Sequence, residues 1–350
     1  MEETEALPGS CNFAGLPLNG HVAADTAYAY RDYAKGNSLD GVAATGILAA
    51  PQDKIEASLA IIQPNILTRS HTPYPGENCG MLRPTYDESW PDRWKKSYEW
   101  DSMELWNSRR DLGYSYQYRN RHRWIIDAAA ELVPAGGSIL DIAGASGNFT
   151  LPLAEKGYSI TWNDLRPEMI ELVKRKYEFG EVEFHPGNIF ELAQQWTGRF
   201  DAIVATEVIE HMAHPDEFLA CAATILKPGG FMFLSTPNGR YFRFDLPRFS
   251  DCPDPSVFES VQFKPNSDGH IFLLDTEECK MLAERAGLEV ERIEVLTNAL
   301  TRGHVKLGHL LPYLPASVVW GFESGTRKLP RTIKEKIHCQ MAAVLRKPVR

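Results

Sequence analysis

Residues 138–147 read Ser-Ile-Leu-Asp-Ile-Ala-Gly-Ala-Ser-Gly, and this stretch decides the fold of the chain. It begins as an apolar run of the β type that carries an acid, Asp141, just ahead of a loop of small residues. Asn148 then opens a helical pattern. Small residues let a ligand approach the backbone closely, and the N-terminus of a helix offers free N–H groups. The stretch therefore predicts a strand, a ligand-binding loop and a helix in direct succession.

A second acid stands at the end of the next predicted strand. Residues 158–162 form an apolar β-type run, and Asn163 and Asp164 follow it. An acid at the tip of the second strand of a βαβ unit is placed to bind two ribose hydroxyls. Asp141 would repel the pyrophosphate of a dinucleotide, whereas it would attract an ammonium or a sulfonium. The two acids together predict a site for a nucleoside that carries positive charge.

The loop resembles the first motif of the class I S-adenosylmethionine-dependent methyltransferases. That motif is usually Asp-x-Gly-x-Gly-x-Gly; here Ala143 and Ala145 replace the first two glycines, and Gly147 is kept. The variant is also similar to the motif of quinone C-methyltransferases. An alanine at positive φ would be strained, so the replacement bears on the geometry of the loop. The resemblance implies S-adenosyl-L-methionine as the cofactor, because this molecule carries an ammonium, a sulfonium and a ribose.

The resemblance also implies a role for each residue of the cofactor site. Asp141 would order the ammonium end of the cofactor, and Gly144 and Gly147 would admit its methionine part. Asp164 would hold the ribose. In the family, a polar residue after the third strand bonds the adenine amino group, and Asn188 takes that place. The predicted cofactor-binding residues are Asp141, Ala143, Gly144, Gly147, Asp164, Asn188, Ile189 and Glu207.

The order of the predicted strands resembles the seven-stranded methyltransferase sheet, in which the last strand inserts antiparallel. We therefore expect an α/β fold: a doubly wound, seven-stranded Rossmann-like methyltransferase sheet with an N-terminal helical cap. A Lys-Pro-Gly-Gly run that ends at Gly230 is predicted to cap a helix over 215–226. The predicted strands cover residues 138–142, 158–162, 182–185, 200–206, 231–234, 288–296 and 339–346.

The chain is expected to divide into three parts. An N-terminal extension whose order the sequence leaves open contains a predicted helix over 52–62. An aromatic-rich helical cap follows, in which Trp90, Trp94 and Tyr98 share one helix face at spacings of four residues. Most of these rings are expected to pack in the core, and one or two to face the site. The parts are 1–84, 85–137 and 138–350, the last being the methyltransferase domain with substrate-side insertions at 239–270 and 297–337.

A cluster of acids and histidines marks the end of the fourth predicted strand. Glu207 stands at its tip, Glu210 and His211 follow, and His270 comes from a later loop. The run resembles that of ubiquinone-pathway O-methyltransferases and that of terminal 2′-O-methyltransferases of small RNAs, which hold a metal with two glutamates and two histidines. Methyl transfer from a sulfonium requires no metal, so we expect none, and the four residues would be ligands only in a metal-dependent enzyme. The predicted catalytic residues are His211 and His270 as candidate general bases, together with Glu210.

Composition limits the classes of partner. The net charge of −9 argues against long nucleic acids as substrates, because they need a broad basic surface. No run approaches the roughly 18 apolar residues of a membrane span, and the acidic start of the chain lacks a signal-peptide pattern. The six cysteines form no Cys-x-x-Cys pair, which favours reduced thiols. These features predict a cytoplasmic enzyme with a small-molecule acceptor, and they leave the oligomeric state open.

The function expected from the sequence is S-adenosylmethionine-dependent methylation, most simply of an oxygen on a small molecule. Two alternatives stay open at this point. One is a metal-dependent RNA 2′-O-methyltransferase, and the other is a non-catalytic module that binds the nucleoside without turnover. A nicotinamide-dependent dehydrogenase is a more distant third. The identity of the acceptor, and the choice between oxygen, carbon and nitrogen, lie beyond the sequence.

Overall fold

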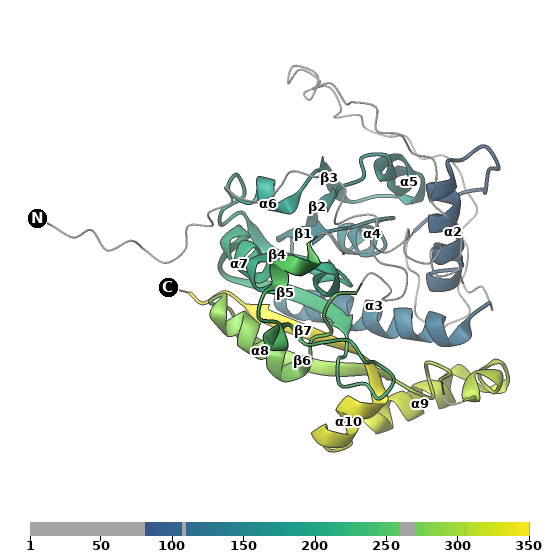
Figure 1. Ribbon diagram of the computed structural model, residues 1–350. Helices are drawn as coiled ribbons and strands as arrows, with labels where there is room; N and C mark the ends of the chain where they lie inside the picture. Colours follow the sequence, from purple (N-terminus) through teal and green to yellow (C-terminus); the bar gives the residue numbers. More distant parts are fainter. Residues whose placement is uncertain (1–80, 107–109, 260–269, 305, 350) are drawn as a thin grey trace, which may run out of the picture.

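Seven strands form one sheet, in the order β3-β2-β1-β4-β5-β7-β6, within the part of the chain that the computed structural model describes (Figure 1). That part comprises residues 81–106, 110–259, 270–304 and 306–349, so the predicted helix 52–62 lies outside it. The first five strands run parallel, and β7 is antiparallel to both of its neighbours. The strands are β1 (Ser138–Ile142), β2 (Ser159–Asp164), β3 (Glu181–Pro186), β4 (Phe200–Thr206), β5 (Leu226–Pro237), β6 (Glu289–Asn298) and β7 (His338–Arg346).

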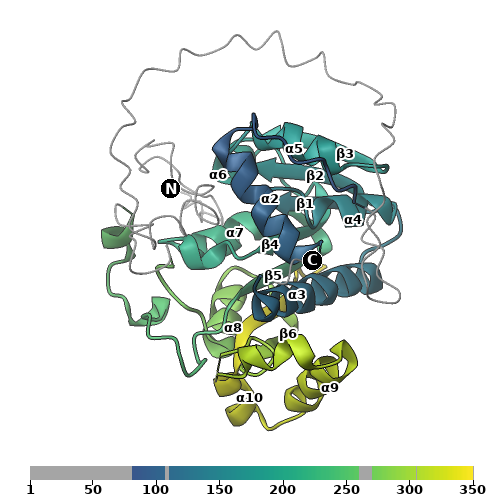
Figure 2. The ribbon, with the colours of Figure 1, turned by 90° about the vertical axis from the view of Figure 1, so that its right-hand side faces the viewer.

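Helices cover both faces of the sheet, as a doubly wound fold requires (Figures 1 and 2). Helices α3, α4 and α5 pack on one face, and α7 and α8 pack on the other. The helices are α2 (Asp92–Glu104), α3 (Leu112–Leu132), α4 (Thr150–Glu155), α5 (Met169–Lys176), α6 (Ile189–Leu192), α7 (Pro215–Ile225), α8 (Thr276–Arg285), α9 (Ala316–Arg327) and α10 (Arg331–Ile337). The predicted seven-stranded Rossmann-like fold is therefore confirmed.

The central strands are apolar on both sides because each face is buried under helices. Ile139 in β1 and Val204 in β4 belong to the core beneath α3, α4 and α5. Leu140 and Ile203, their chain neighbours, belong to the core beneath α7 and α8. Since successive side chains of a strand point to opposite faces, a continuous apolar run is what a doubly covered strand needs. This burial fixes the strand ends at which the candidate site is built.

The aromatic helix α2 packs as a layer beside α5. The rings of Trp90 and Trp94 lie 5.9 Å apart, and those of Trp90 and Tyr98 lie 5.7 Å apart, so the three predicted neighbours do form one cluster. The indole of Trp94 donates a hydrogen bond to the carbonyl of Glu168, just ahead of α5. These three rings therefore pack helix α2 against the α5 side of the fold. The boundaries assigned to the cap and to the methyltransferase domain stay predictions.

The predicted glycine cap of the helix before β5 is wrong. Helix α7 ends at Ile225, and β5 already begins at Leu226. Gly229, at φ +82°, donates its N–H to the carbonyl of Lys347, and Lys347 donates its N–H to the carbonyl of Gly230. The glycine pair is thus held against the chain that leaves β7, instead of folding back on the helix. The described cysteines Cys221, Cys252, Cys279 and Cys339 are free, as expected.

Candidate active site

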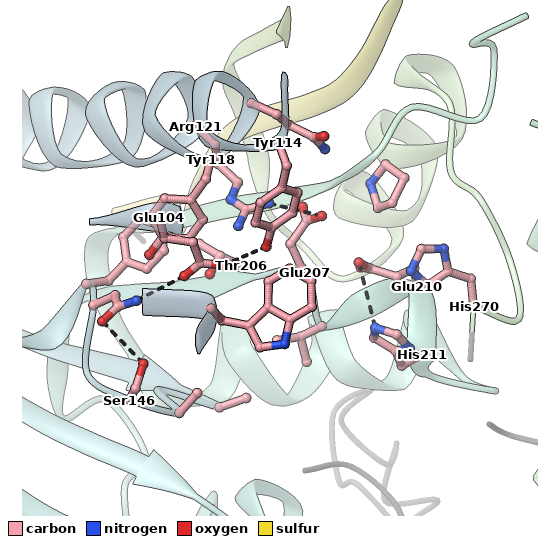
Figure 3. A pocket seen from close by; sticks show the side chains of 18 of the residues that line it. Glu104, Tyr114, Tyr118, Arg121, Ser146, Thr206, Glu207, Glu210, His211 and His270 are labelled. Carbon is pink, nitrogen blue, oxygen red and sulfur yellow. Dashed lines mark hydrogen bonds and ion pairs between the residues drawn. The ribbon is translucent and has the colours of Figure 1, made fainter. Parts of the chain in front are cut away.

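A pocket of about 400 Å³ opens at the carboxyl ends of the central strands (Figure 3). The loop after β1 and the segment after β4 line one part of it, and α2 and α3 supply another. In an open α/β sheet, ligands bind in the crevice outside the carboxyl ends of the strands, at the point where the strand order reverses. Here β1 and β4 are neighbours that lead to opposite halves of the sheet. The pocket therefore lies where this architecture places a ligand.

The loop after β1 is held in an unusual backbone conformation. Ala143 has a φ of 55° and Ala145 a φ of 45°, both in the left-handed region that alanine rarely enters. Hydrogen bonds hold the strained loop in place: the N–H of Gly144 donates to the carbonyl of Asn163, and the N–H of Ala145 donates to Asp164. Strain of this kind persists where the surrounding structure enforces it, and it gathers at functional sites.

The two glycines of the loop are required for different reasons. A Cβ on Gly144 would lie 2.5 Å from the indole of Trp162, and Gly144 lines the pocket. Gly147 has a φ of 78°, and a Cβ there would meet Val173 at 2.8 Å. Gly147 is not among the residues that line the pocket. A glycine is therefore required at position 147 by the positive φ of the turn and by the close packing of Val173 in α5, a role that the sequence did not reveal.

Asp141 lines the pocket from β1 and is buried. It accepts a hydrogen bond of 2.5 Å from the hydroxyl of Thr150 at the start of α4. Burial raises the pKa of Asp141 to about 7, and the nearby carboxylate of Asp164 adds to this. A cation bound next to Asp141 would favour the ionised form. The predicted contact of Asp141 with an ammonium stays a prediction.

Asp164 is also buried, yet its charge is balanced inside the protein. Nε and Nη2 of Arg166 each donate to the carboxylate at 2.9 Å, and the backbone N–H of Ala145 donates at 3.0 Å. Arg166 itself lines the pocket. Ribose hydroxyls that reach Asp164 must therefore share its oxygens with Arg166 or displace it. The sequence analysis missed this arginine, although it stands only two residues after the acid.

A smaller cavity of about 30 Å³ adjoins the pocket on the side of β2 and β3. Ala143 and Val208 line both spaces, which places the two next to each other. Asn188 and Ile189 line the smaller cavity together with Asp164. The Oδ1 atom of Asn188 accepts the N–H of Phe190 at 3.1 Å and so caps helix α6. The predicted ribose and adenine residues thus surround one cavity that is separate from the larger space.

Glu207 leaves the end of β4 at a φ of 55° and faces the pocket. Arg121 of α3 approaches its carboxylate at 3.1 Å, and the hydroxyl of Ser235 donates to it at 3.1 Å. Arg121 is buried, and its guanidinium lies over the ring of Tyr118, 5.0 Å from the ring centre. The charge of Glu207 is therefore compensated by a partner on another element, which the sequence analysis did not identify.

A buried carboxyl from α2 completes the wall opposite the imidazoles (Figure 3). Glu104 accepts hydrogen bonds from the hydroxyl of Tyr114 at 2.6 Å and from the amide of Asn148 at 3.1 Å. Burial, reinforced by the nearby Asp101, raises the pKa of Glu104 to about 7. Asp101 in turn forms a buried ion pair of 2.8 Å with Lys176. The network fixes α2 against the loop, and Glu104 was not predicted as a site residue.

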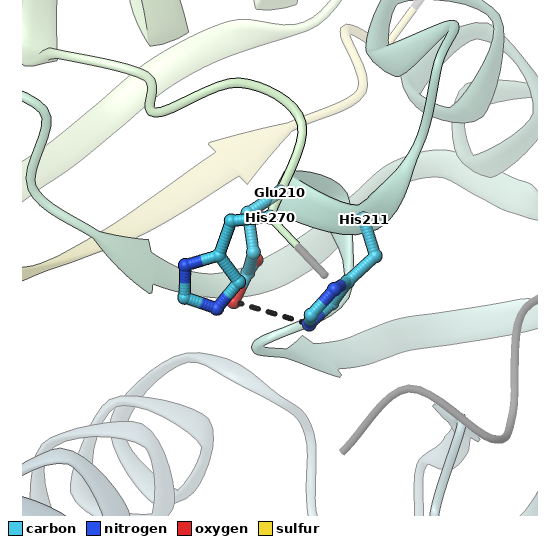
Figure 4. Close-up of side chains that lie close together, drawn as sticks. All are labelled: Glu210, His211 and His270. Atoms are coloured by element: carbon cyan, nitrogen blue, oxygen red, sulfur yellow. Dashed lines mark ion pairs between the residues drawn. The ribbon is translucent and has the colours of Figure 1, made fainter. Parts of the chain in front are cut away.

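Glu210, His211 and His270 come together at the other end of the pocket (Figure 4). One ligand atom from each lies within 4.8 Å of the others, and the two imidazole centres are 4.9 Å apart. Glu210 and His211 lie on a short 3₁₀ turn, Ile209–His211, after β4. The structure thus brings three of the four predicted cluster residues into one group. Glu207 is not part of that group.

The electrostatics of the cluster are unbalanced. Glu210 is fully buried, and its Oε2 atom accepts a hydrogen bond from the hydroxyl of Thr236 at 3.0 Å. Its Oε1 atom accepts no hydrogen bond from any described residue and lies 3.9 Å from Nε2 of His211. Burial and the charge of Glu207 raise the pKa of Glu210 well above its usual value. Burial lowers the pKa of His270 to about 4, so this imidazole is neutral at neutral pH.

Both predicted insertions contribute to the pocket. Phe244 lines it from the 239–270 segment, and Arg302 and His304 line it from the 297–337 segment. The hydroxyl of Tyr241 lies 2.6 Å from Nδ1 of His304. Burial lowers the pKa of His304 to about 4, with help from the charge of Arg302. The wall farthest from the loop is therefore built from segments that carry no recognisable sequence motif.

Comparison with known sequences finds a matching family model and a set of curated relatives. The model, described as a methyltransferase domain, matches residues 114–293. A ubiquinone biosynthesis O-methyltransferase from Xanthomonas axonopodis pv. citri is 35% identical over 112 residues, which are 31% of this chain and 47% of that protein. The protein of the same name from Caulobacter vibrioides is 36% identical over 114 residues, 32% of this chain and 45% of its own. The chain spans about half the length of the curated relatives it matches.

A search of solved structures adds distant neighbours. A SAM-dependent methyltransferase from Archaeoglobus fulgidus aligns with 72% of this chain and 99% of its own, at 15% identity and a TM-score of 0.45. The fold assignment rests on the strand order and pairing described above and does not depend on this likeness. Among the described residues, no helix has the length and apolar character needed to cross a membrane.

Proposed function

This chain belongs to the methyltransferase domain family, with S-adenosyl-L-methionine as the cofactor, and we propose that it transfers the methyl group to an oxygen of a small molecule. One observation carries the proposal. The loop residues Ala143 and Gly144 line the same 400 Å³ pocket as the imidazoles of His211 and His270. The proposed donor site and the two imidazoles thus face one space. The relatives named as O-methyltransferases support oxygen as the acceptor atom.

The donor side of the proposal uses the acids at the strand ends. Asp141 would meet the ammonium of the cofactor. Burial raises the pKa of Asp141 to about 7, and the bound cation would lower that pKa and so favour the ionised carboxylate. Gly144 would let the methionine part pass close to the backbone. Asp164 would hold the ribose hydroxyls, with Arg166 yielding part of its bidentate contact. Asn188, in the adjoining cavity, would bond the adenine amino group.

The acceptor step needs a proton to leave the hydroxyl. The acceptor oxygen attacks the methyl carbon, the carbon–sulfur bond breaks, and the electron pair stays on sulfur, which leaves as the neutral thioether of S-adenosylhomocysteine. The hydroxyl proton passes to the imidazole of His211 or His270. His270 enters this step without a proton, because burial holds its pKa near 4. Orientation of the two reactants and exclusion of water supply much of the remaining acceleration.

The same cluster fits a divalent cation, and this is a second candidate for its role. Glu210, His211 and His270 converge within 4.8 Å, and Oε1 of Glu210 accepts no hydrogen bond from a described residue. A carboxylate with two imidazoles is a suitable ligand set for a hard or borderline ion. A bound cation would act as a Lewis acid on the acceptor oxygen. In that case His211 and His270 would be ligands instead of bases.

The test is production of S-adenosylhomocysteine with a panel of phenolic and catecholic acceptors, read by mass spectrometry. Release that requires an acceptor supports the proposal. Release without any methylated oxygen in the product, or tight donor binding with no turnover across the panel, contradicts it. A parallel series with a chelator, followed by Mg²⁺ or Mn²⁺, assigns the cluster: retained activity favours the base, and loss with rescue favours the cation.

A further inference from the structure

One end of the molecule carries an apolar surface that the pocket does not use. Helices α9 and α10 lie beyond β6, past the edge of the sheet, in both views (Figures 1 and 2). Large apolar side chains are exposed there: Tyr313 is 84% exposed and Phe322 is 54% exposed. The others are Leu310, Leu314, Val318, Leu329 and Ile333. So many exposed apolar side chains on one short segment mark an interaction surface.

Part of this surface is a shallow groove along α9. Val318, Phe322 and Leu329 line it, and Gly321 and Gly325 form its floor, where an added Cβ would meet nothing within 4 Å. The groove measures about 380 Å³, and its lining residues lie on α9 or directly after it. No other described element covers it. The groove is thus open to a partner that lies against α9.

The charge of this segment is opposite to that of the whole chain. Residues 297–337 contain seven Lys and Arg residues and two Glu residues, whereas the chain as a whole carries −9. Both acids point inward and are buried. Glu323 accepts the N–H groups of Thr297 and Asn298, and Glu335 accepts the hydroxyl of Thr276. The charge that the segment shows to its surroundings is therefore basic.

Some of the basic side chains have no acidic partner within the described residues. Lys334 approaches Glu294, and Arg331 pairs with Glu277 and Glu335. Lys328 and Lys336 are exposed, and no ion pair connects either of them to a described acid. These two lysines flank Leu329 and Ile333 in the sequence. Uncompensated cations next to exposed apolar side chains form the pattern of a helix that lies in a membrane interface.

We propose that this surface docks on a membrane that contains anionic phospholipid. Tyr313, Val318, Phe322 and Leu329 enter the interface, while Lys328 and Lys336 meet the headgroup phosphates; together these six residues are the α9–α10 surface. A second copy of the chain is a poorer occupant, because a two-fold contact through one surface brings its basic groups together. The exposed apolar side chains are compatible with both occupants, whereas the positive charge of Lys328 and Lys336 favours the anionic membrane.

Docking there would also bring the pocket close to the lipid. The segment that carries the α9–α10 surface supplies Arg302 and His304 to the pocket wall. Glu323 ties α9 to the end of β6 through the N–H groups of Thr297 and Asn298, at 2.7 and 2.9 Å. The surface and the wall are therefore parts of one braced unit. The inference itself needs no turnover, so it stands apart from the proposed function.

The experiment is co-sedimentation of the full chain with vesicles of phosphatidylcholine, with and without phosphatidylglycerol. We expect binding to the anionic vesicles, weakened by salt, and little binding to the neutral ones. Each interfacial lysine contributes roughly fivefold to such binding, so the double variant Lys328→Glu, Lys336→Glu should bind at least tenfold more weakly. Phe322→Ser should lower binding to the anionic vesicles at both low and high salt concentration, since it removes an inserted ring whose contribution does not depend on charge.

Matched controls keep the test specific. Phe179 is 53% exposed on another part of the molecule, so Phe179→Ser should leave vesicle binding unchanged, and so should Lys156→Glu. Circular dichroism should be the same for all variants, because every changed side chain is exposed. Equal loss in Phe322→Ser and Phe179→Ser would overturn the proposal. So would a dimer in solution that Phe322→Ser dissociates, combined with no vesicle binding by the native chain.

Discussion

Asp164 and Glu210 are equally buried acids on the same rim of the sheet, yet the protein treats them differently. Asp164 receives two guanidinium hydrogen bonds and one backbone N–H hydrogen bond from Arg166, and one from the backbone of Ala145. Glu210 receives one from the hydroxyl of Thr236, and the acid Glu207 stands nearby. Burying a charge costs several kcal/mol unless a partner repays it. The charge of Asp164 is stabilised by Arg166, whereas the carboxyl group of Glu210 requires a proton or a bound cation.

This difference separates the two halves of the site. At Asp164, the protein supplies internal partners for the charge, and a ligand has to compete with Arg166 for the carboxylate. On the acceptor side, the imidazoles of His211 and His270 surround a carboxyl whose pKa is raised well above its usual value. Such groups gather at functional sites because the ligand completes them. We therefore expect the charge state of Glu210 to depend more strongly on a bound partner than that of Asp164.

The largest effect is expected at the acceptor side. His211→Ala or His270→Ala should lower turnover by about a hundred- to ten-thousand-fold if the imidazole accepts the hydroxyl proton. Donor affinity should change little, which calorimetry checks. Glu210→Gln separates the two roles of the cluster, since a cation requires the carboxylate and a base does not. Damage by Glu210→Gln equal to that of the histidine variants would move the cluster to metal binding. His309→Ala, at an exposed position outside the pocket lining, serves as the control.

The next largest effect is expected at the donor side. Asp164→Asn should weaken binding of S-adenosyl-L-methionine by about ten- to a hundred-fold, because it removes charge-assisted hydrogen bonds to the ribose. Calorimetric titration gives the affinity. Asp201→Asn is the matched control, because Asp201 pairs with Lys227 away from the pocket lining. An unchanged affinity in Asp164→Asn would show that the ribose lies elsewhere.

A smaller effect is expected from Gly144→Ala. The new methyl group would lie 2.5 Å from the indole of Trp162 and force a shift, at a cost of about 1–3 kcal/mol. Thermal unfolding should show the loss. Gly321→Ala, in α9 with nothing within 4 Å of its Cβ, should be neutral or stabilising by up to about 1 kcal/mol. A Gly144→Ala protein as stable as the wild type would show that the loop accommodates a methyl group beside Trp162 without strain.

A further effect on stability is its dependence on pH. Burial lowers the pKa of His270 to about 4, whereas an unfolded histidine titrates near 6.5. Between these values the unfolded chain binds a proton that the folded chain does not, so stability is lost as the pH falls through this window. His270→Asn should flatten the dependence of the melting temperature on pH between 6.5 and 4, relative to wild type. Parallel curves for wild type and His270→Asn would contradict the burial of a neutral imidazole.

The residues proposed for the donor side were predicted from local patterns. Asp141 lies near the end of β1 and Asp164 ends β2, both strands have continuous apolar runs, and strand ends are where such a sheet binds ligands. The positive φ angles of Ala143 and Ala145 could not be read, because they are imposed by contacts to Asn163 and Asp164. The glycine pair before β5 was misread for a similar reason, since its partner lies after β7.

The sequence predicted that one or two rings of the aromatic cap face the site, and Trp100, Tyr114 and Tyr118 line the pocket, but the residues of this wall from α2 and α3 were not named in advance. A signal was nonetheless present on α3. Tyr114, Gln117, Tyr118 and Arg121 recur at the spacing of one helix face, and all four line the pocket. A polar and aromatic stripe on a predicted amphipathic helix is therefore a pointer to a site. Glu104, on the preceding helix, has no such pattern, and its role depends on tertiary contacts with Tyr114 and Asn148.

The central claim is that the methyl donor and the histidine pair occupy one space. Nuclear magnetic resonance of ¹⁵N-labelled imidazoles, recorded while S-adenosyl-L-methionine is added, tests it most directly. The ring signals of His211 and His270 should shift as the site fills, and that of the exposed His309 should stay in place. In Asp164→Asn the same shifts should need roughly ten- to a hundred-fold more donor. A saturated donor site with His211 and His270 unmoved would contradict the account.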